Sequence, residues 1–191
     1  CLADFFAPKG VADTIGGFAV TAGLGCTEKV AEFKKANDDY NAILLESLAD
    51  RLAEAFAERL HQRVRTEFWG HVSIEKLANE ELIAEKYQGI RPAPGYPACP
   101  EHTEKATLWK LLDVEKNIGM TLTESMAMWP ASAVSGWYFS HPESQYFVLC
   151  CIGKDQVVDY AKRKDWDLKT AEKWLAPKLG YVPEDRIFRC W

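Results

Sequence analysis

The sequence predicts an α+β domain in which helices, one of them long, flank a central antiparallel sheet. Three observations predict this class. A long amphipathic segment runs from Asn37 to Trp69, and several short apolar segments are separated by turn residues. The chain has 191 residues, which is enough to bury one hydrophobic core. Its 48% hydrophobic and 27% charged residues are typical of a globular protein and exclude a disordered tail.

The first two expected elements are a strand and the long helix. A buried strand is predicted within the apolar, glycine-bounded run Thr14-Ile-Gly-Gly-Phe-Ala-Val-Thr-Ala-Gly. The helix is predicted over 37–69, with acidic N-cap candidates at its start and Gly70 after its end. Every fourth residue is apolar, which predicts a buried face: Leu44, Leu48, Leu52, Phe56, Leu60, Val64 and Phe68. Ala49, Ala53 and Ala57 widen this predicted buried face. The opposite, polar face carries Ser47, Asp50, Glu54, Glu58, His61 and Arg65.

The middle of the chain predicts further helices and strands around an irregular loop. A short helix is expected at 80–86, and a second one, capped by Thr103, at 105–116. Between them, 88–100 contains four prolines and two glycines, which exclude a helix or a central strand. Two or three strands are expected next, at 122–129, 134–140 and 146–152, and a turn at His141-Pro-Glu-Ser joins the last two.

Two more helices are expected near the end of the chain. Asp155 is the predicted N-cap of a helix that reaches Lys164, and Asp167 is the predicted N-cap of one that reaches Leu175. The tail at 182–191 has no clear period.

Composition and motifs narrow the functional class. A net charge of −5 argues against non-specific nucleic-acid binding, which needs a basic patch. The six cysteines form no C-x-x-C pair, and we expect reduced thiols in a cytoplasmic protein. There is no signal peptide and no apolar run approaching about 18 residues, so no membrane span is expected.

No catalytic signature is present either. The chain lacks a G-x-S-x-G elbow, a Walker A motif and a dinucleotide fingerprint, and the four histidines have no zinc-ligand spacing. His102 has two interpretations, a general acid or a structural hydrogen-bonding residue. The absence of catalytic motifs favours a module that binds a reactive small molecule and presents it elsewhere.

The proline-rich loop at 88–100 is the strongest binding signal. Its fixed φ angles hold Arg91 and Tyr96 on a stiff backbone. Arginine matches a carboxylate with two parallel hydrogen bonds, and tyrosine offers a flat apolar face. Together they suit a small zwitterion. The alternative interpretation is that Arg91 pairs with a structural acid and the prolines shape a turn. On residue type alone, Tyr146, Glu54 and Glu85 are interpreted as structural or surface residues.

Several longer runs resemble the activation domain of cobalamin-dependent methionine synthases. The most specific is Gln88-Gly-Ile-Arg-Pro-Ala-Pro-Gly-Tyr-Pro-Ala-Cys-Pro-Glu-His-Thr-Glu-Lys. Others are Leu122-Thr-Glu-Ser-Met-Ala-Met-Trp-Pro, Val134-Ser-Gly-Trp-Tyr-Phe-Ser-His-Pro and Trp174-Leu-Ala-Pro-Lys-Leu-Gly-Tyr. The resemblance covers 1–181, which we assign to the domain, and leaves 182–191 as an extension of unknown role.

The resemblance implies a fold and a function. It implies a C-shaped α+β domain with a central antiparallel sheet, which binds S-adenosylmethionine and presents its methyl group for reductive remethylation of cob(II)alamin. Cobalamin would sit in a neighbouring domain, the electron would come from a flavodoxin-type partner, and zinc would belong to another part of the full-length enzyme. No stand-alone catalytic centre is expected here.

The same resemblance implies ligand-binding roles. Arg91 would hold the ligand carboxylate, and Tyr96 and Tyr146 would line the sulfonium and adenosine. Glu54 and Glu85 would make polar contacts. The backbone of Pro92, Ala93 and Pro94 would hydrogen-bond the adenine.

Two features of the chain leave alternatives open. The chain begins at Cys1 with residues typical of a folded interior, which predicts a fragment of a longer polypeptide. The resemblance implies that an aspartate upstream of Cys1 binds the ligand ammonium. An interaction domain of the same fold that no longer binds the ligand is therefore an alternative. A Rossmann-type methyltransferase is disfavoured, because no glycine-rich strand-to-helix loop with an acidic partner is present.

Overall fold

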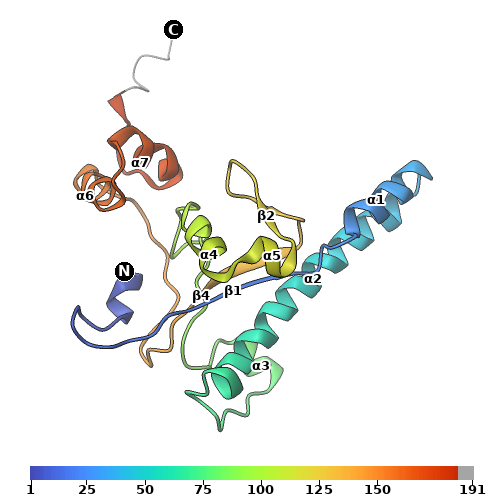
Figure 1. Ribbon diagram of the computed structural model, residues 1–191, viewed down its shortest axis with the longest axis horizontal. Coiled ribbons are helices and arrows are strands. Elements are labelled where there is room, and N and C mark those ends of the chain that lie inside the picture. Colours follow the sequence, from blue (N-terminus) through green and yellow to red (C-terminus); the bar gives the residue numbers. More distant parts are fainter. Residues whose placement is uncertain (185–191) are drawn as a thin grey trace.

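The computed structural model describes residues 1–184. Its centre is an antiparallel pair of strands, β1 (Gly16–Thr21) and β4 (Ala133–Tyr138). The register pairs Gly16 with Tyr138 and Thr21 with Ala133. Helices flank this pair, and the long helix α2 crosses it (Figure 1). The α+β class and these two strands are therefore confirmed.

The long helix is confirmed to within two residues at its start. α2 (Asp39–Arg63) begins after Asp38, whose carboxylate accepts a hydrogen bond from the backbone N–H of Asn41 at 3.1 Å. It continues into a π-helical turn, η2 (Val64–Phe68), and ends before Gly70, which has a φ of 69°. The left-handed conformation at Gly70 is one that glycine adopts without strain.

The prediction of the buried α2 face was right for its alanines and wrong for its leucines. Leu48, Leu52 and Phe56 are 52%, 62% and 50% exposed, whereas Ala49, Ala53 and Ala57 are buried. Ala53 and Ala57 pack with Phe18, Val20, Val134 and Tyr138 of the two strands. The alanine row and the leucine row share the same four-residue spacing and differ only by a rotation of about 100° around the axis. Small side chains let the helix backbone approach the sheet closely, so the alanine row faces the core.

Two residues of the predicted polar face are also buried. His61 and Arg65 are almost inaccessible to solvent. Arg65 is compensated by an ion pair with Glu75 at 2.7 Å. The burial of both residues places this side of α2 in the interior, where a charge needs such a partner.

Four other helices agree with the sequence prediction to different degrees. α1 (Cys26–Lys35) was not predicted and packs against α2. α3 (Asn79–Ile83) confirms the short helix. The helix predicted at 105–116 is two helices, α4 (Glu104–Leu112) and α5 (Val114–Ile118), because Asp113 has a φ of 47° between them. The hydroxyl of Thr103 donates to Glu101 at 2.7 Å and makes no helix-capping hydrogen bond.

The strand predicted at 122–129 is a small hairpin. β2 (Thr121–Leu122) pairs with β3 (Met128–Trp129), and Met126, with a φ of 63°, lies in the turn. This is a correction of one strand to two short ones.

No strand forms at 146–152, which corrects a second prediction. The turn is present, since the N–H of Ser144 donates to the carbonyl of His141 at 3.0 Å. However, the outer edge of β4 is occupied by the proline-rich loop: Ile90 bridges Phe139, and Pro92 accepts from Trp137 at 2.9 Å. The segment after the turn therefore cannot pair with β4.

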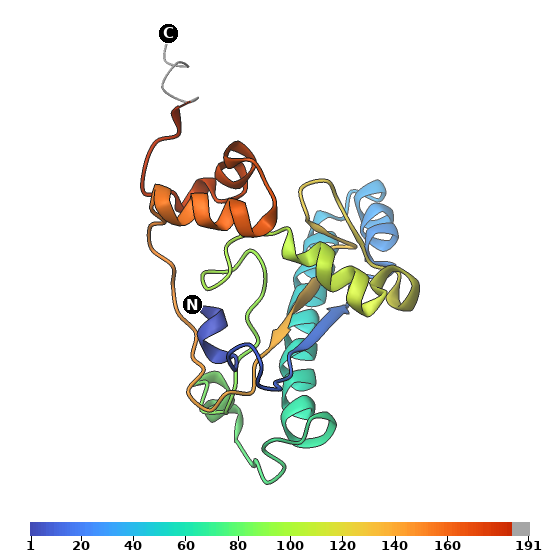
Figure 2. The ribbon, with the colours of Figure 1, turned by 60° about the vertical axis from the view of Figure 1, so that its left-hand side comes forward.

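The last two helices form a small cluster of their own (Figure 2). Asp167 caps α7 (Leu168–Trp174) as predicted, accepting from Thr170 at 2.8 Å. The N-cap of α6 (Lys154–Lys164) is Gly153 and not Asp155, which lies in the first turn. A short 3-10 helix, η3 (Ala176–Lys178), follows. Most of 182–191 lies outside the described residues, and the division of the chain at 181 stays a prediction.

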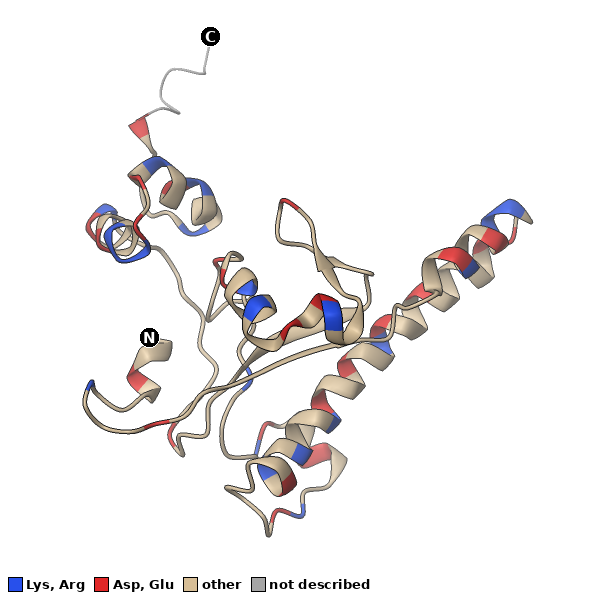
Figure 3. Cartoon of the chain, viewed as in Figure 1, with Lys and Arg blue, Asp and Glu red and all other residues tan. Residues whose placement is uncertain are grey.

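Charged residues lie on the helices and loops, and β1 and β4 carry none (Figure 3). The central sheet therefore offers an apolar wall to whatever lies against it. Among the described residues, no helix combines the length and the apolar character needed to cross a membrane.

Candidate functional site

A cavity of about 370 Å³ lies between the strands, α2 and the proline-rich loop. This volume falls in the range of small-molecule sites. Its lining comes from five segments that are distant in sequence: Phe18, Glu54, Glu85, Arg91, Pro92, Ala93, Tyr96, Pro97, Ala98, Val134, Tyr146, Phe147 and Val148. Most of these side chains are apolar, and the charged ones are two carboxylates and one guanidinium.

The proline-rich loop is folded on itself and tied to β4. The N–H of Gly95 donates to the carbonyl of Cys99 at 2.7 Å, and the N–H of Tyr96 donates to that of Ala93 at 3.1 Å. Gly95 has a φ of 97°, which favours glycine, and an added Cβ would clash with the His102 ring. The loop is therefore a rigid wall of the cavity.

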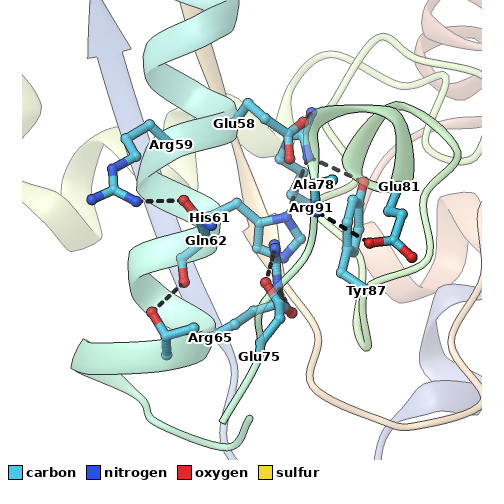
Figure 4. Close-up of polar contacts among 11 residues, drawn as sticks. Glu58, Arg59, His61, Gln62, Arg65, Glu75, Ala78, Glu81, Tyr87 and Arg91 are labelled. Carbon is cyan, nitrogen blue, oxygen red and sulfur yellow. Dashed lines mark hydrogen bonds and ion pairs between the residues drawn. The ribbon is translucent and has the colours of Figure 1, made fainter. Parts of the chain in front are cut away.

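Arg91 makes polar contacts with several side chains around it (Figure 4). Its Nη2 pairs with a carboxylate oxygen of Glu58 at 2.6 Å, and its Nη1 lies 3.2 Å from both Nδ1 of His61 and the hydroxyl of Tyr87. Its backbone N–H donates to the hydroxyl of Tyr146 at 3.0 Å. The two sequence interpretations of Arg91 thus coexist, because it pairs with an acid and also lines the cavity.

The tautomer of His61 follows from its partner. A guanidinium offers only donors, so Nδ1 of His61 accepts and the ring proton is on Nε2. Burial, together with the nearby charges of Arg65 and Arg91, lowers the pKa of His61 to about 2. The ring is therefore neutral at physiological pH.

Two tyrosines near Arg91, Tyr87 and Tyr96, have raised pKa values. Burial raises the pKa of Tyr87, and a hydrogen bond to Tyr146 raises it further. Burial also raises the pKa of Tyr96, and the nearby charge of Glu54 acts in the same direction. Their hydroxyls therefore keep their protons around neutral pH and stay neutral.

The structure brings seven of the eight predicted site residues to one cavity. These are Glu54, Glu85, Arg91, Pro92, Ala93, Tyr96 and Tyr146. Pro94 is fully buried and does not line it. His102 does not line it either and lies 3.1 Å from Nζ of Lys105. The assigned roles stay predictions.

Fewer backbone groups of residues 92–94 are free for the predicted adenine contact than the sequence suggested. Proline has no N–H, so Ala93 is the one donor among residues 92–94. The carbonyl of Pro92 already accepts from Trp137, and that of Ala93 accepts from Tyr96. The adenine contact of this backbone stays a prediction.

Sequence reasoning missed two groups of residues. The first is the apolar lining, including Phe18, which stacks on Tyr138 with ring centroids 4.7 Å apart. The second is the set around Arg91, namely Glu58, His61 and Tyr87. Nothing in the local pattern distinguishes these from surface or core residues.

Comparison with known proteins identifies the family. The family model described as "Vitamin B12 dependent methionine synthase, activation domain" matches residues 1–165. The chain belongs to this family. A crystal structure of the MetH reactivation domain bound to AdoHcy is 63% identical, with a TM-score of 0.93. The match covers 95% of this chain and 57% of that one, so this activation domain spans little more than half of the solved chain.

Proposed function

We propose that this activation domain binds S-adenosylmethionine in the cavity and presents its methyl group to cobalamin held by a neighbouring domain. The observation that carries the proposal is the convergence of Arg91, two tyrosines and two carboxylates on one largely apolar cavity. The 63% identity to a domain solved with AdoHcy supports it, because AdoHcy differs from S-adenosylmethionine only by the methyl group. Cytoplasmic location and a flavodoxin-type electron donor remain predictions.

The chemistry of the lining matches the parts of the ligand. Arg91 suits the carboxylate, and Glu54 and Glu85 suit the ammonium or the ribose hydroxyls. Tyr96 and Tyr146 offer aromatic faces to the sulfonium cation. The adenine would lie between apolar walls such as Phe18 and Val134.

The residues of this chain act by binding and orientation. The sulfonium already carries an activated methyl group, so no general base is required for its transfer. Cobalamin, when bound in its own domain, supplies the nucleophile, and a flavodoxin-type partner supplies one electron. Holding the methyl group in a fixed direction in a dry cavity is the contribution of Arg91, the tyrosines and the stiff loop.

A calorimetric titration tests the proposal. The folded chain is titrated with S-adenosylmethionine, beside Arg91→Ala and the control Arg59→Ala. Arg59 is an exposed arginine of α2 that hydrogen-bonds Gln62 and does not line the cavity. We expect saturable binding, weakened by Arg91→Ala about thirtyfold, the loss of about 2 kcal/mol from a charge-assisted pair. Arg59→Ala should bind as the wild type does. A folded chain that binds nothing would contradict the proposal and favour an interaction domain of the same fold.

A further inference from the structure

The guanidinium of Arg91 is held by side chains on two of its nitrogens. Glu58 takes Nη2, and His61 and Tyr87 share Nη1. Glu58 and His61 lie one turn apart on α2, and Tyr87 precedes the proline-rich loop. This set, the Arg91 cage, places an otherwise flexible side chain between two separate elements of the fold (Figure 4).

The cage leaves one edge of the guanidinium open. Arginine has five N–H donors in a fixed plane. Nη1 contacts His61 and Tyr87, Nη2 pairs with Glu58, and no described residue bonds Nε. Nε and the neighbouring Nη2 form the edge of a guanidinium that can bind a carboxylate through two parallel hydrogen bonds. Because Arg91 also lines the cavity, we take the edge that contains Nε as the one left for a ligand.

His61 is itself fixed in orientation. Its ring is 1% exposed and stacks on Tyr138 with centroids 5.2 Å apart and an angle of 16°. The ring of Tyr87 meets it edge-on at 5.0 Å. The acceptor at Nδ1 therefore cannot rotate away from Arg91. The Tyr87 hydroxyl, which also hydrogen-bonds Tyr146, extends the same network to a second cavity residue.

We propose that His61 and Tyr87 are positioning residues that orient Arg91, so that selectivity for ligands with an amino-acid carboxylate depends on them. This inference rests on the proposed function. It predicts an effect confined to the carboxylate, because neither residue lines the cavity. The hydroxyl of Tyr146, which Tyr87 also contacts, keeps its hydrogen bond from the backbone N–H of Arg91 in these variants. A residue with a purely structural role would instead change the affinity for all ligands of the cavity together.

The test compares S-adenosylmethionine with decarboxylated S-adenosylmethionine, which differs only in the carboxylate. Dissociation constants for both are measured with the wild type, Tyr87→Phe, His61→Leu and His61→Asn. Tyr87→Phe removes one oxygen and keeps the ring, so it reports even if the His61 variants unfold. In His61→Asn, the side-chain oxygen Oδ1 is bonded to Cγ, as Nδ1 is in histidine, and it can still accept a hydrogen bond from Arg91. This variant is the conservative substitution that should restore the selectivity.

We expect Tyr87→Phe and His61→Leu to weaken S-adenosylmethionine binding about fivefold each, the effect of one lost hydrogen bond, and to leave the decarboxylated ligand unchanged. His61→Asn should recover most of the lost selectivity. Equal weakening of both ligands, or no change in either, would overturn the inference while leaving the proposed function intact. A wild-type chain that binds neither ligand would overturn both.

Discussion

Arg65 and Glu75 form a bidentate ion pair in the interior, next to the Arg91 cage. Nε and Nη2 of Arg65 lie 2.8 and 2.7 Å from the two carboxylate oxygens of Glu75, and the two side chains are 0% and 3% exposed. The Arg65 guanidinium also lies 4.3 Å from the ring centre of Tyr87. The pair thus ties the segment after α2 to the residue that contacts Arg91.

Removing one member of this pair should be strongly destabilising. Glu75→Gln leaves the buried Arg65 charge uncompensated, and we expect a loss of about 3–5 kcal/mol in the free energy of unfolding, measured with urea. The control is Glu67→Gln, which breaks the pair with Arg63, where the side chains are 43% and 48% exposed. That exposed pair should contribute less than about 1 kcal/mol. Similar losses in the two variants would show that burial does not set the strength of these pairs.

The buried His61 should make stability depend on pH. Its pKa is lowered to about 2, and the charged or titratable groups that face it are Arg65, Arg91, His71, Tyr87 and Tyr138. In the unfolded chain a histidine binds a proton below about pH 6.5, whereas the folded His61 does not. The unfolded state therefore binds more protons, and stability falls as the pH decreases from about 6.5, by up to about 1.4 kcal/mol per unit.

Urea midpoints between about pH 5 and 7, where a free histidine titrates, measure this slope. His61→Asn should have a shallower slope than the wild type, while His71 and His102, whose pKa values burial also lowers, keep a residual one. An unchanged slope in His61→Asn would mean that His61 is protonated in the folded protein or accessible to water.

Local signals predicted the elements that local chemistry determines. The Asp167 cap and the glycine-bounded strand β1 were found because a side chain or a short apolar run specifies each one. The strand expected at 146–152 failed because β4 has one free edge, which the segment from Ile90 to Pro92 occupies. Two segments that are distant in sequence compete for one strand edge, and the sequence pattern of either segment alone does not show which of them pairs.

The site residues also divide into those that local sequence predicted and those that it did not. Arg91 and Tyr96 were singled out because prolines around them signal a stiff loop. His61 was assigned to a polar helix face, because its spacing on α2 carries no information about what lies opposite. Tyr87 and Arg91, which give His61 its role, come from another part of the chain.

The exposed leucine row of α2 should tolerate polar residues. Because Leu48 and Leu52 are more than half exposed, Leu48→Gln with Leu52→Gln should change the stability of the 191-residue chain by no more than about 0.5 kcal/mol. Ala53→Leu, on the same helix, should cost about 1–3 kcal/mol by overpacking the contact with Phe18 and Val134. Urea denaturation of the variants measures both effects. A large loss in the double glutamine variant would show that the leucine row is buried in solution.

Gly95 links the backbone of the proline-rich loop to the cavity. Gly95→Ala places a Cβ against the His102 ring at a φ of 97°, whereas Gly10→Ala has a φ of 101° with nothing within 4 Å. Both variants should lose about 1 kcal/mol or more from left-handed strain. Only Gly95→Ala must also displace the His102 ring or the loop that carries Pro92, Ala93 and Tyr96, so its stability loss should be larger.

The same shift should reach the ligand. We expect Gly95→Ala to weaken S-adenosylmethionine binding by about tenfold, equivalent to about 1.4 kcal/mol, and Gly10→Ala to leave it unchanged. Adding His102→Ala to Gly95→Ala removes the clashing ring and should restore part of the affinity, while the strain at position 95 persists. Calorimetry and urea denaturation on the same samples separate the two effects. If Gly95→Ala behaves like Gly10→Ala in both measurements, the loop does not define the cavity wall, because a displaced loop would have to change the affinity.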